Sequence, residues 1–443
     1  MTGIGAYAFS TTGLTDITLP ASVTDVGVSA FRECASLKSA TIYNSGVAIG
    51  ENAFQNCASL TLRAVAGSAV QAYAEENGIP FEALATGGQC GENVYWTMDY
   101  QTGAVTISGT GPTSNYYYFG YSNPTPSPFT NNSAIRTVVI EEGVTAIGDS
   151  LLGGCPNLTS VSIPGSVTRI GQEAFRYCPK LLRVDIPEGV TTIGHSAFRD
   201  SESLKIVTLP NTLTRLEYEM FRGCTGLQEI TIPGSVTELG SSVFNNCQSL
   251  SRLTIRNGLT TIPQLTFYHC DSLQSLIIPE SVTALNGITF MACGQLSEVT
   301  VLNREATFGS ACFYACAEDL ILYGFSGSTT EAYALEKGIT FAAIDGALGD
   351  ADLTLPAGLQ VIGEEAFSGV AARVVCIPDG VTSLGGCAFA DCPNLIQVRI
   401  PGSVTSIADS AFDGCPGELV IFGEAGSYAE TYAAARGYAF SEE

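Results

Sequence analysis

The chain has 443 residues, of which 45% are apolar and only 14% charged, and its formal net charge is −24. This hydrophobicity with so few charges excludes a disordered chain, and the acidic balance excludes a nucleic-acid binder, which needs a basic face. No stretch approaches the roughly 18 apolar residues that span a bilayer, so we expect no membrane insertion.

The first predicted block, residues 1–84, is a short series of repeats. Its anchors are spaced by 22 and then 23 residues: Phe9, Phe31 and Phe54. Cys34 and Cys57 lie three residues after the last two anchors.

The start of this block falls inside a repeat. Residues 4–20 align without gaps on residues 362–378, where a strand at Leu353–Pro356 comes first. Nothing corresponds to that strand before residue 4, so we expect the native protein to extend upstream of Met1.

Three segments interrupt the repeats in the same way and predict short helices. They run over Gly67–Phe81, Gly327–Phe341 and Gly426–Phe440. Each has a serine followed three residues later by Gln or Glu, which is the capping box of a helix start. Each also has a glycine where a left-handed residue would end the helix: Gly78, Gly338 and Gly437. We expect these helices to close a block and shield its last open coil.

The second predicted block, residues 85–345, opens differently. Apolar residues alternate in two runs within residues 90–108, the first through Trp96 and the second through Ile107, with a turn between them. This predicts a β-hairpin that forms the lid of the block. Residues 112–133 follow as a loop rich in Pro, Asn and Ser, which carries Tyr116, Tyr117, Tyr118, Phe119 and Tyr121.

Eight repeats then follow with a period of 23 residues, in which Leu152 holds the first anchor position. The anchors after it are Phe175, Phe198, Phe221, Phe244, Phe267, Phe290 and Phe313. Three residues after each anchor stands a second column: Cys155, Cys178, Ser201, Cys224, Cys247, Cys270, Cys293 and Cys316. A leucine column follows three residues later. Several columns locked to one period indicate a repeat architecture.

Each unit contains three predicted pieces. Val161 and Ile163 alternate as a short strand with two inward residues. Val167–Gly171 is a second extended piece that ends in a turn glycine, and Gln172–Tyr177 fits one short helical turn. One unit cannot bury its own apolar side, so the units must stack. The expected fold is an α/β repeat solenoid with a parallel sheet on one face.

A third block, residues 346–443, repeats the same columns. Its anchors are Phe367, Phe389 and Phe412, with spacings of 22 and 23 as in the first block. Cys392 and Cys415 occupy the cysteine column.

The unit resembles the BspA-like, treponemal-type branch of the leucine-rich repeats. The resemblance rests on Cys–x–x–Leu, a Val/Ile–x–Ile–Pro strand, Val–Thr–x–Ile–Gly and Ala–Phe, as in Cys155–Phe175 and Cys178–Phe198. It covers nearly the whole chain outside residues 85–133. It implies a right-handed coil, curved into a solenoid, on a cell surface or in the medium. The family has no shared catalytic residues, and its members bind host or matrix proteins, other cells or glycans.

Two surfaces are candidates for binding. The first is the outward face of the strands: Arg183, Asp185, Lys205, Thr208, Glu229, Thr231, Arg252 and Thr254. Charges vary along this face, which suits recognition, although ordinary solvated sheet residues would look the same. The same outward threonine column continues to Thr300. The second candidate is the aromatic loop, through Tyr116, Tyr117, Tyr118 and Tyr121, since aromatic residues are enriched in recognition sites. These tyrosines would equally serve to cover the open end of the block.

The cysteines and histidines indicate no catalytic or metal chemistry. Coils stacked at about 4.8 Å with parallel side chains keep Cβ atoms too far apart for disulfides, so we interpret the 15 cysteines mainly as a ladder of buried, apolar thiols. Cys312 and Cys316 have no further ligands to complete a zinc site. Cys90 lies outside every column, Cys376 is at an outward strand position, and both histidines, His195 and His269, are expected on the surface.

The sequence therefore predicts a monomeric, non-catalytic module without cofactor or metal, extracellular or on a cell surface, that binds protein or glycan. Two alternatives stay open. One is a structural spacer that displays a functional domain outside this sequence. The other is a remote enzyme, which would need a pocket of titratable groups that the columns do not provide.

Overall fold

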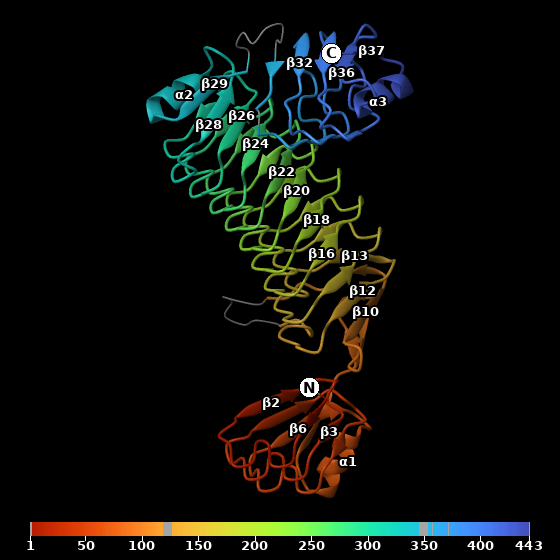
Figure 1. The fold of residues 1–443 in the computed structure, drawn as a ribbon. Helices are drawn as coiled ribbons and strands as arrows, with labels where there is room; N and C mark the ends of the chain where they lie inside the picture. The colour runs from red at the N-terminus through yellow and green to blue at the C-terminus, as the bar shows by residue number, and fades with distance from the viewer. Residues whose placement is uncertain (1, 118–125, 345–352, 357, 371, 443) are drawn as a thin grey trace. The chain divides into compact units, whose positions relative to one another are not determined.

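The computed structural model describes residues 2–117, 126–344, 353–356, 358–370 and 372–442 (Figure 1). The chain folds into two compact units, Met1–Val167 with Cys178–Leu181, and Thr168–Tyr177 with Leu182–Glu443. Both units consist of stacked coils, and most coils contribute one longer and one shorter strand. The predicted solenoid is confirmed. The division into three blocks stays a prediction from the sequence columns.

In the first unit, the longer strands of the N-terminal coils form a parallel sheet whose order follows the chain. It contains β2 (Asp16–Leu19), β4 (Ser39–Ile42), β6 (Thr61–Val65) and β7 (Phe81–Leu84). The short strands beside it are β1 (Gly3–Ile4), β3 (Asp25–Val26) and β5 (Ala48–Ile49).

The predicted hairpin is formed by β9 (Val94–Asp99) and β10 (Ala104–Gly109), which pair antiparallel. It begins the next sheet of the first unit, which also contains β8 (Gly87–Gln89), β12 (Thr137–Ile140) and β14 (Ser160–Ser162). Two shorter strands, β11 (Gly111–Pro112) and β13 (Val144–Ile147), pair beside it.

In the second unit, the longer strands form three rows of parallel strands. Figure 1 labels strands of each row. The first row is β16 (Arg183–Asp185), β18 (Ile206–Thr208), β20 (Glu229–Ile232) and β22 (Arg252–Ile255). The second is β24 (Ser275–Ile278), β26 (Glu298–Val301), β28 (Ile321–Gly324) and β29 (Thr340–Ala343). The third is β30 (Leu353–Thr354), β32 (Val374–Cys376), β34 (Gln397–Arg399), β36 (Val420–Gly423) and β37 (Ala439–Glu442).

The shorter strands of the second unit pair with one another, in sheets separate from those of the longer strands. They are β15 (Arg169–Ile170), β17 (Thr192–Ile193), β19 (Arg215–Leu216), β21 (Glu238–Leu239), β23 (Thr261–Ile262), β25 (Ala284–Leu285), β27 (Thr307–Phe308), β31 (Val361–Ile362), β33 (Ser383–Leu384) and β35 (Ser406–Ile407).

The 23-residue period sets the register between coils. Thr231 pairs with Thr254 and Glu229 with Arg252 across β20 and β22, so equivalent residues of successive repeats lie side by side. The anchor phenylalanines point inward and stack in parallel: Phe198, Phe221 and Phe244 are fully buried, with ring centroids 5.4 and 5.6 Å apart.

The three predicted capping helices are present: α1 (Ala69–Glu76), α2 (Thr329–Lys337) and α3 (Tyr428–Arg436). Each begins after a serine, Ser68, Ser328 or Ser427, whose hydroxyl accepts a hydrogen bond from a backbone N–H in the first helical turn. The predicted glycines after the helices all have left-handed φ angles, between 64° and 78°. Capping residues thus define both ends of each helix.

The predicted helical turn at Gln172–Tyr177 is wrong. Glu173 and Tyr177 both have φ of 55°, in the left-handed region, and their N–H groups donate to the next coil, that of Tyr177 to Arg199 O at 2.9 Å. A right-handed helical turn would direct these N–H groups into its own segment. The N–H groups of Glu173, Phe175 and Tyr177 instead continue the hydrogen bonding between coils outside the strands.

The predicted loop 112–133 ends earlier than expected. Phe129 is fully buried, stands 23 residues before Leu152, and its carbonyl accepts from the Cys155 thiol at 3.4 Å. It therefore holds an anchor position, one coil ahead of the eight repeats. Trp96 of β9 packs edge-on against it, with centroids 5.3 Å apart, so the hairpin covers this coil.

The cysteine column is also a column of hydrogen bonds. All cysteines carry free thiols, and each column thiol donates to the carbonyl of an anchor in the preceding coil, as from Cys224 to Phe198 O at 3.1 Å. Ser201 makes the same bond to Phe175 O at 2.9 Å. The interpretation as apolar fillers is therefore incomplete, because the column thiols also donate hydrogen bonds. The column tolerates serine because the hydroxyl replaces the thiol as donor.

Candidate binding site on the sheet face

The outward face of β16, β18, β20 and β22 carries the charged and hydroxyl residues that the sequence singled out. On β16, Arg183 Nε donates to Asp185 Oδ2 at 2.8 Å, and Asp185 accepts from the Thr208 hydroxyl of β18 at 3.2 Å. These bonds, with that from Arg183 first, lower the pKa of Asp185. Both members of the pair are more than half exposed, so we expect it to contribute less than about 1 kcal/mol to stability.

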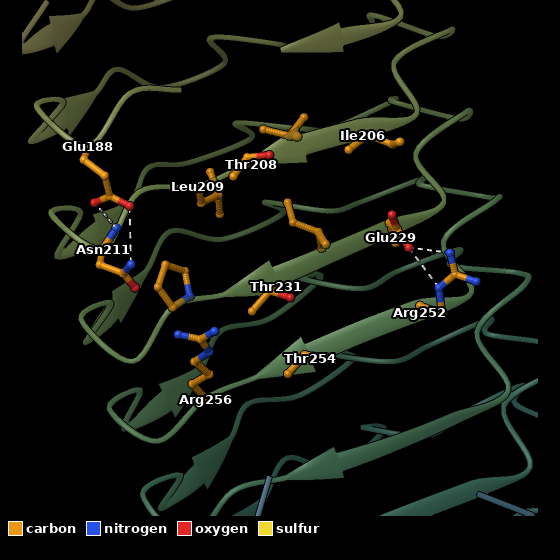
Figure 2. A pocket seen from close by; sticks show the side chains of 13 residues that line it. Glu188, Ile206, Thr208, Leu209, Asn211, Glu229, Thr231, Arg252, Thr254 and Arg256 are labelled. Atoms are coloured by element: carbon orange, nitrogen blue, oxygen red, sulfur yellow. Dashed lines mark hydrogen bonds and ion pairs between the residues drawn. The ribbon is translucent and has the colours of Figure 1, made fainter. Parts of the chain in front are cut away.

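A hollow of about 420 Å³ lies on this face, and we call it the sheet-face hollow. It is lined by Glu188, Ile206, Val207, Thr208, Leu209, Asn211, Glu229, Ile230, Thr231, Pro233, Arg252, Thr254 and Arg256. Figure 2 shows Thr208, Thr231 and Thr254 in a row along its middle. The row follows from the repeat, since 23-residue spacing places one threonine of each strand beside the next.

Each side of the hollow carries charged groups of both signs, and the two sides differ in bonding. On one side Arg252 Nε donates to Glu229 Oε2 at 2.9 Å across adjacent strands, as Figure 2 shows. On the other side, the Asn211 backbone N–H donates to Glu188 Oε2 at 3.0 Å, and Arg256 completes that side. The hollow therefore offers hydroxyls between charged groups of both signs, with apolar contacts from Leu209 and Pro233.

Five of the eight predicted sheet-face residues line this hollow: Thr208, Glu229, Thr231, Arg252 and Thr254. The other three, Arg183, Asp185 and Lys205, do not line it, although the structure places all three exposed at the surface.

The sequence interpretation missed the side formed by Glu188, Asn211 and Arg256. Glu188 and Asn211 follow the closing proline of their strands, and Arg256 stands at the position of that proline in its own coil. Only alternation within strands was considered. Glu188 and Asn211 are themselves 23 residues apart, so the turn column was a signal that could have found them.

The aromatic loop is only partly described. Tyr118 and Tyr121, like Phe119, lie outside the described residues. Tyr116 is 8% exposed, and burial raises the pKa of its hydroxyl, whereas Tyr117 is 38% exposed. The burial of Tyr116 fits the expectation that these tyrosines cover the open end of the block. Of the two described tyrosines, Tyr117 is the one exposed to a ligand.

The threonine column does not stay open along the whole sheet. Thr300 of β26 is 1% exposed. Its column neighbours, Ile277 of β24 and Tyr323 of β28, pack against the core of the C-terminal coils. Since these coils cover the later strands, Thr300 belongs to an internal contact rather than to an exposed ladder.

The remaining thiols and imidazoles form no cluster that resembles a reactive centre. Burial raises the pKa of Cys178 to about 12 and that of Cys90 to about 11, so these thiols stay neutral and unreactive. Cys376 is half-buried on β32. His195 is exposed, and His269 lies 3.2 Å from an Asp271 oxygen at the surface.

Among the described residues, no group of three or more His, Cys, Asp and Glu side chains is placed to hold a metal ion. Within the same residues, we find no helix with the length and hydropathy required to cross a bilayer.

Comparison with known proteins gives one family. The model of the BspA type leucine-rich repeat region matches in six copies, over residues 2–70, 125–224, 191–319 and 350–428. No curated protein matches the sequence.

Several solved structures are similar. A leucine-rich repeat protein from Bacteroides ovatus is 22% identical with a TM-score of 0.41, over 97% of this chain and 92% of that one. A leucine-rich cell surface protein from Faecalibacterium prausnitzii is 24% identical with a TM-score of 0.33, over 77% and 96%. The leucine-rich repeat protein of T. pallidum is 22% identical with a TM-score of 0.31, over 40% and 86%.

Proposed function

Since this chain belongs to the BspA-type leucine-rich repeat family, we propose that it is a non-catalytic binding module that recognises a protein or glycan ligand through the sheet-face hollow. We further propose that it acts outside the cell, on the surface or in the medium. Repeat solenoids present extended surfaces that suit recognition, and fold alone does not name a ligand.

One observation carries the proposal. Residues from three successive strands, with the turns beside them, converge on one hollow of about 420 Å³ that lies on an open sheet face. Its middle is a row of threonine hydroxyls. One side carries the pair of Arg252 and Glu229, and the other carries Glu188, which accepts from Asn211, and Arg256, which is paired with Glu364 outside the hollow. Hydroxyls and charges of both signs suit hydrogen bonding to sugar hydroxyls or to a polar protein surface, while the threonines have no imidazole or thiol among the lining residues to activate them.

The test is to fill the hollow without touching the core. Thr231 and Thr237 are exposed threonines of the same coil, on its longer strand and before its shorter strand. A glycan array and a panel of purified extracellular proteins would be probed with the unchanged chain, with Thr231→Trp, and with Thr237→Trp as the matched control. We expect Thr231→Trp to weaken binding at least tenfold and Thr237→Trp to change it less than twofold.

Equal binding by all three proteins would reject the hollow as the site. Absence of any binding by the unchanged chain would favour the structural spacer instead. Display outside the cell is tested separately, by antibody labelling of intact cells that carry the native protein.

A further inference from the structure

The C-terminal coils pack over the later part of the same sheet face. Ile277 of β24 and Tyr323 of β28 pack against the core of these coils, and Thr300, which pairs with both on β26, is 1% exposed. The contact also includes an ion pair between Arg256 and Glu364. The C-terminal coils therefore cover the continuation of the face that stays open at the sheet-face hollow.

One carboxylate is enclosed in this contact. Glu298 of β26 faces Gly358 of the C-terminal coils, whose backbone N–H donates to it. A Cβ built on Gly358 would lie 2.4 Å from Oε1 and 2.6 Å from Oε2, so the opposite backbone lies against the whole group. Oε2 is buried and has no hydrogen-bond partner among the described residues. This oxygen is therefore shielded from water and lacks a donor.

The neighbours of Glu298 on the sheet do not compensate its charge. Ser275 of β24 and Ile321 of β28 stand opposite it on the adjacent strands. The near titratable group is Tyr323, whose own pKa is raised by burial and then by the charge of Glu298. Burial likewise raises the pKa of Glu298, and the Gly358 N–H opposes this shift.

The charged groups around the contact are already paired or lie elsewhere. A cleft of about 370 Å³ separates the sheet from the C-terminal coils here, and its charged lining residues are Arg252 and Glu298. Arg252 stands two coils before Glu298 and has the carboxylate partner described above. On the C-terminal coils, Glu364 is paired with Arg256, and Glu365 does not line the cleft.

The protonation of Glu298 is therefore linked to the packing of the C-terminal coils. Burial disfavours the ionised form, so the pKa of Glu298 is higher when the coils cover it than when water reaches it. The packing is then strongest with Glu298 protonated, at a pH below the ordinary value of 4.5. This contribution is lost as the pH rises through the raised value.

We propose that Glu298 and Gly358 form a pH-sensitive contact, which holds the C-terminal coils against the sheet face when Glu298 is protonated and loosens when it ionises. Loosening uncovers Ile277 and Thr300, which belong to the same outward column as Thr231. The contact thus sets how much of the sheet face is open to a partner. The proposal stands whether or not the sheet-face hollow is a binding site.

Two measurements on the full chain test the contact. Carbon-13 NMR of labelled glutamate carboxyl groups, assigned through the backbone, follows the protonation of Glu298, and we expect a midpoint above 4.5. Hydroxyl-radical footprinting with mass spectrometry follows the exposure of Tyr323, normalised to Tyr314, which is 66% exposed. One pKa unit is a factor of ten in the packing equilibrium, so we expect labelling of Tyr323 about twofold or more higher at neutral pH than at pH 4.5.

Three variants separate Glu298 from the other carboxylates. Glu298→Gln keeps the size of the side chain and removes its titration, so labelling of Tyr323 should be low and equal at both pH values. Gly358→Ala places a methyl group against the carboxylate, so labelling should be high at both. Glu280→Gln, at an exposed acidic residue outside the cleft, should behave as the unchanged chain does. Circular dichroism verifies that each variant is folded.

Three results would overturn the proposal. A titration midpoint of Glu298 at or below 4.5 would show that the contact does not favour the protonated form, and this measurement requires no variant to fold. Labelling of Tyr323 that is independent of pH in the unchanged chain would show that the coils stay packed with either form. Equal pH dependence in Glu298→Gln and the unchanged chain would assign the change to another group, such as the pair of Arg256 and Glu364.

Discussion

The stack of anchor rings allows the clearest prediction of a change in the free energy of unfolding. Phe221 is fully buried between Phe198 and Phe244, with ring planes only 6° from parallel on both sides. Truncating a buried Phe to Ala costs about 3–5 kcal/mol, with more where the site cannot collapse. Here the coils are held by hydrogen bonds such as Phe221 N to Val243 O at 2.9 Å, so the two flanking rings cannot close the gap.

We therefore expect Phe221→Ala to lower the free energy of unfolding by about 4 kcal/mol. Phe221→Leu, the residue type that Leu152 has in the same column, should cost about 1–1.5 kcal/mol. Tyr314, which is 66% exposed, provides the control, and Tyr314→Ala should change stability by less than about 0.5 kcal/mol.

Urea unfolding followed by circular dichroism measures these costs, and hydrogen exchange locates them. Because the coils around Phe221 are coupled through their neighbours in the stack, exchange in Phe221→Ala should rise first in the coils around residues 198–244. A cost below about 1 kcal/mol for Phe221→Ala, or a uniform loss of protection reaching the N-terminal coils, would refute the description of the core as a stack with local coupling.

Two further predictions follow from buried polar groups. Cys224→Ser should leave stability within about 0.5 kcal/mol, since Ser201 already donates in this column, whereas Cys224→Ala should cost about 1 kcal/mol; equal costs in thermal unfolding would contradict the hydrogen-bond role. Glu219 is 4% exposed and paired with Arg199 and Arg222. Burial alone would raise the pKa of Glu219, but hydrogen bonds from Arg222 and Tyr218 and the charges of both arginines lower it below its ordinary 4.5. Its stabilisation is therefore present above pH 4.5 and lost as pH falls through the lower folded value, so Glu219→Gln should make the unfolding midpoint less dependent on pH in that range.

The sequence by itself determined the coil. A 23-residue period of apolar anchors leaves one way to bury every anchor, which is to stack the units with equal register. The capping helices were equally predictable. The serine and the Gln or Glu that cap the start of each helix, and the glycine after its end, act within one helix and need no distant partner. Five of the thirteen residues that line the sheet-face hollow were found from the sequence, because alternation in a strand decides which side chains face outward.

The tertiary structure decided the burial and pairing of residues that occupy the same column of the repeat. Thr231 and Thr300 occupy the same column, yet one lines an open hollow and the other is buried under coils that follow it by some 50 residues or more in the chain. Similarly, Glu229 has the cation of the next strand whereas Glu298 has a glycine N–H from another block. Burial and pairing of an outward residue depend on which distant segment packs over it, and local periodicity carries no information about that segment.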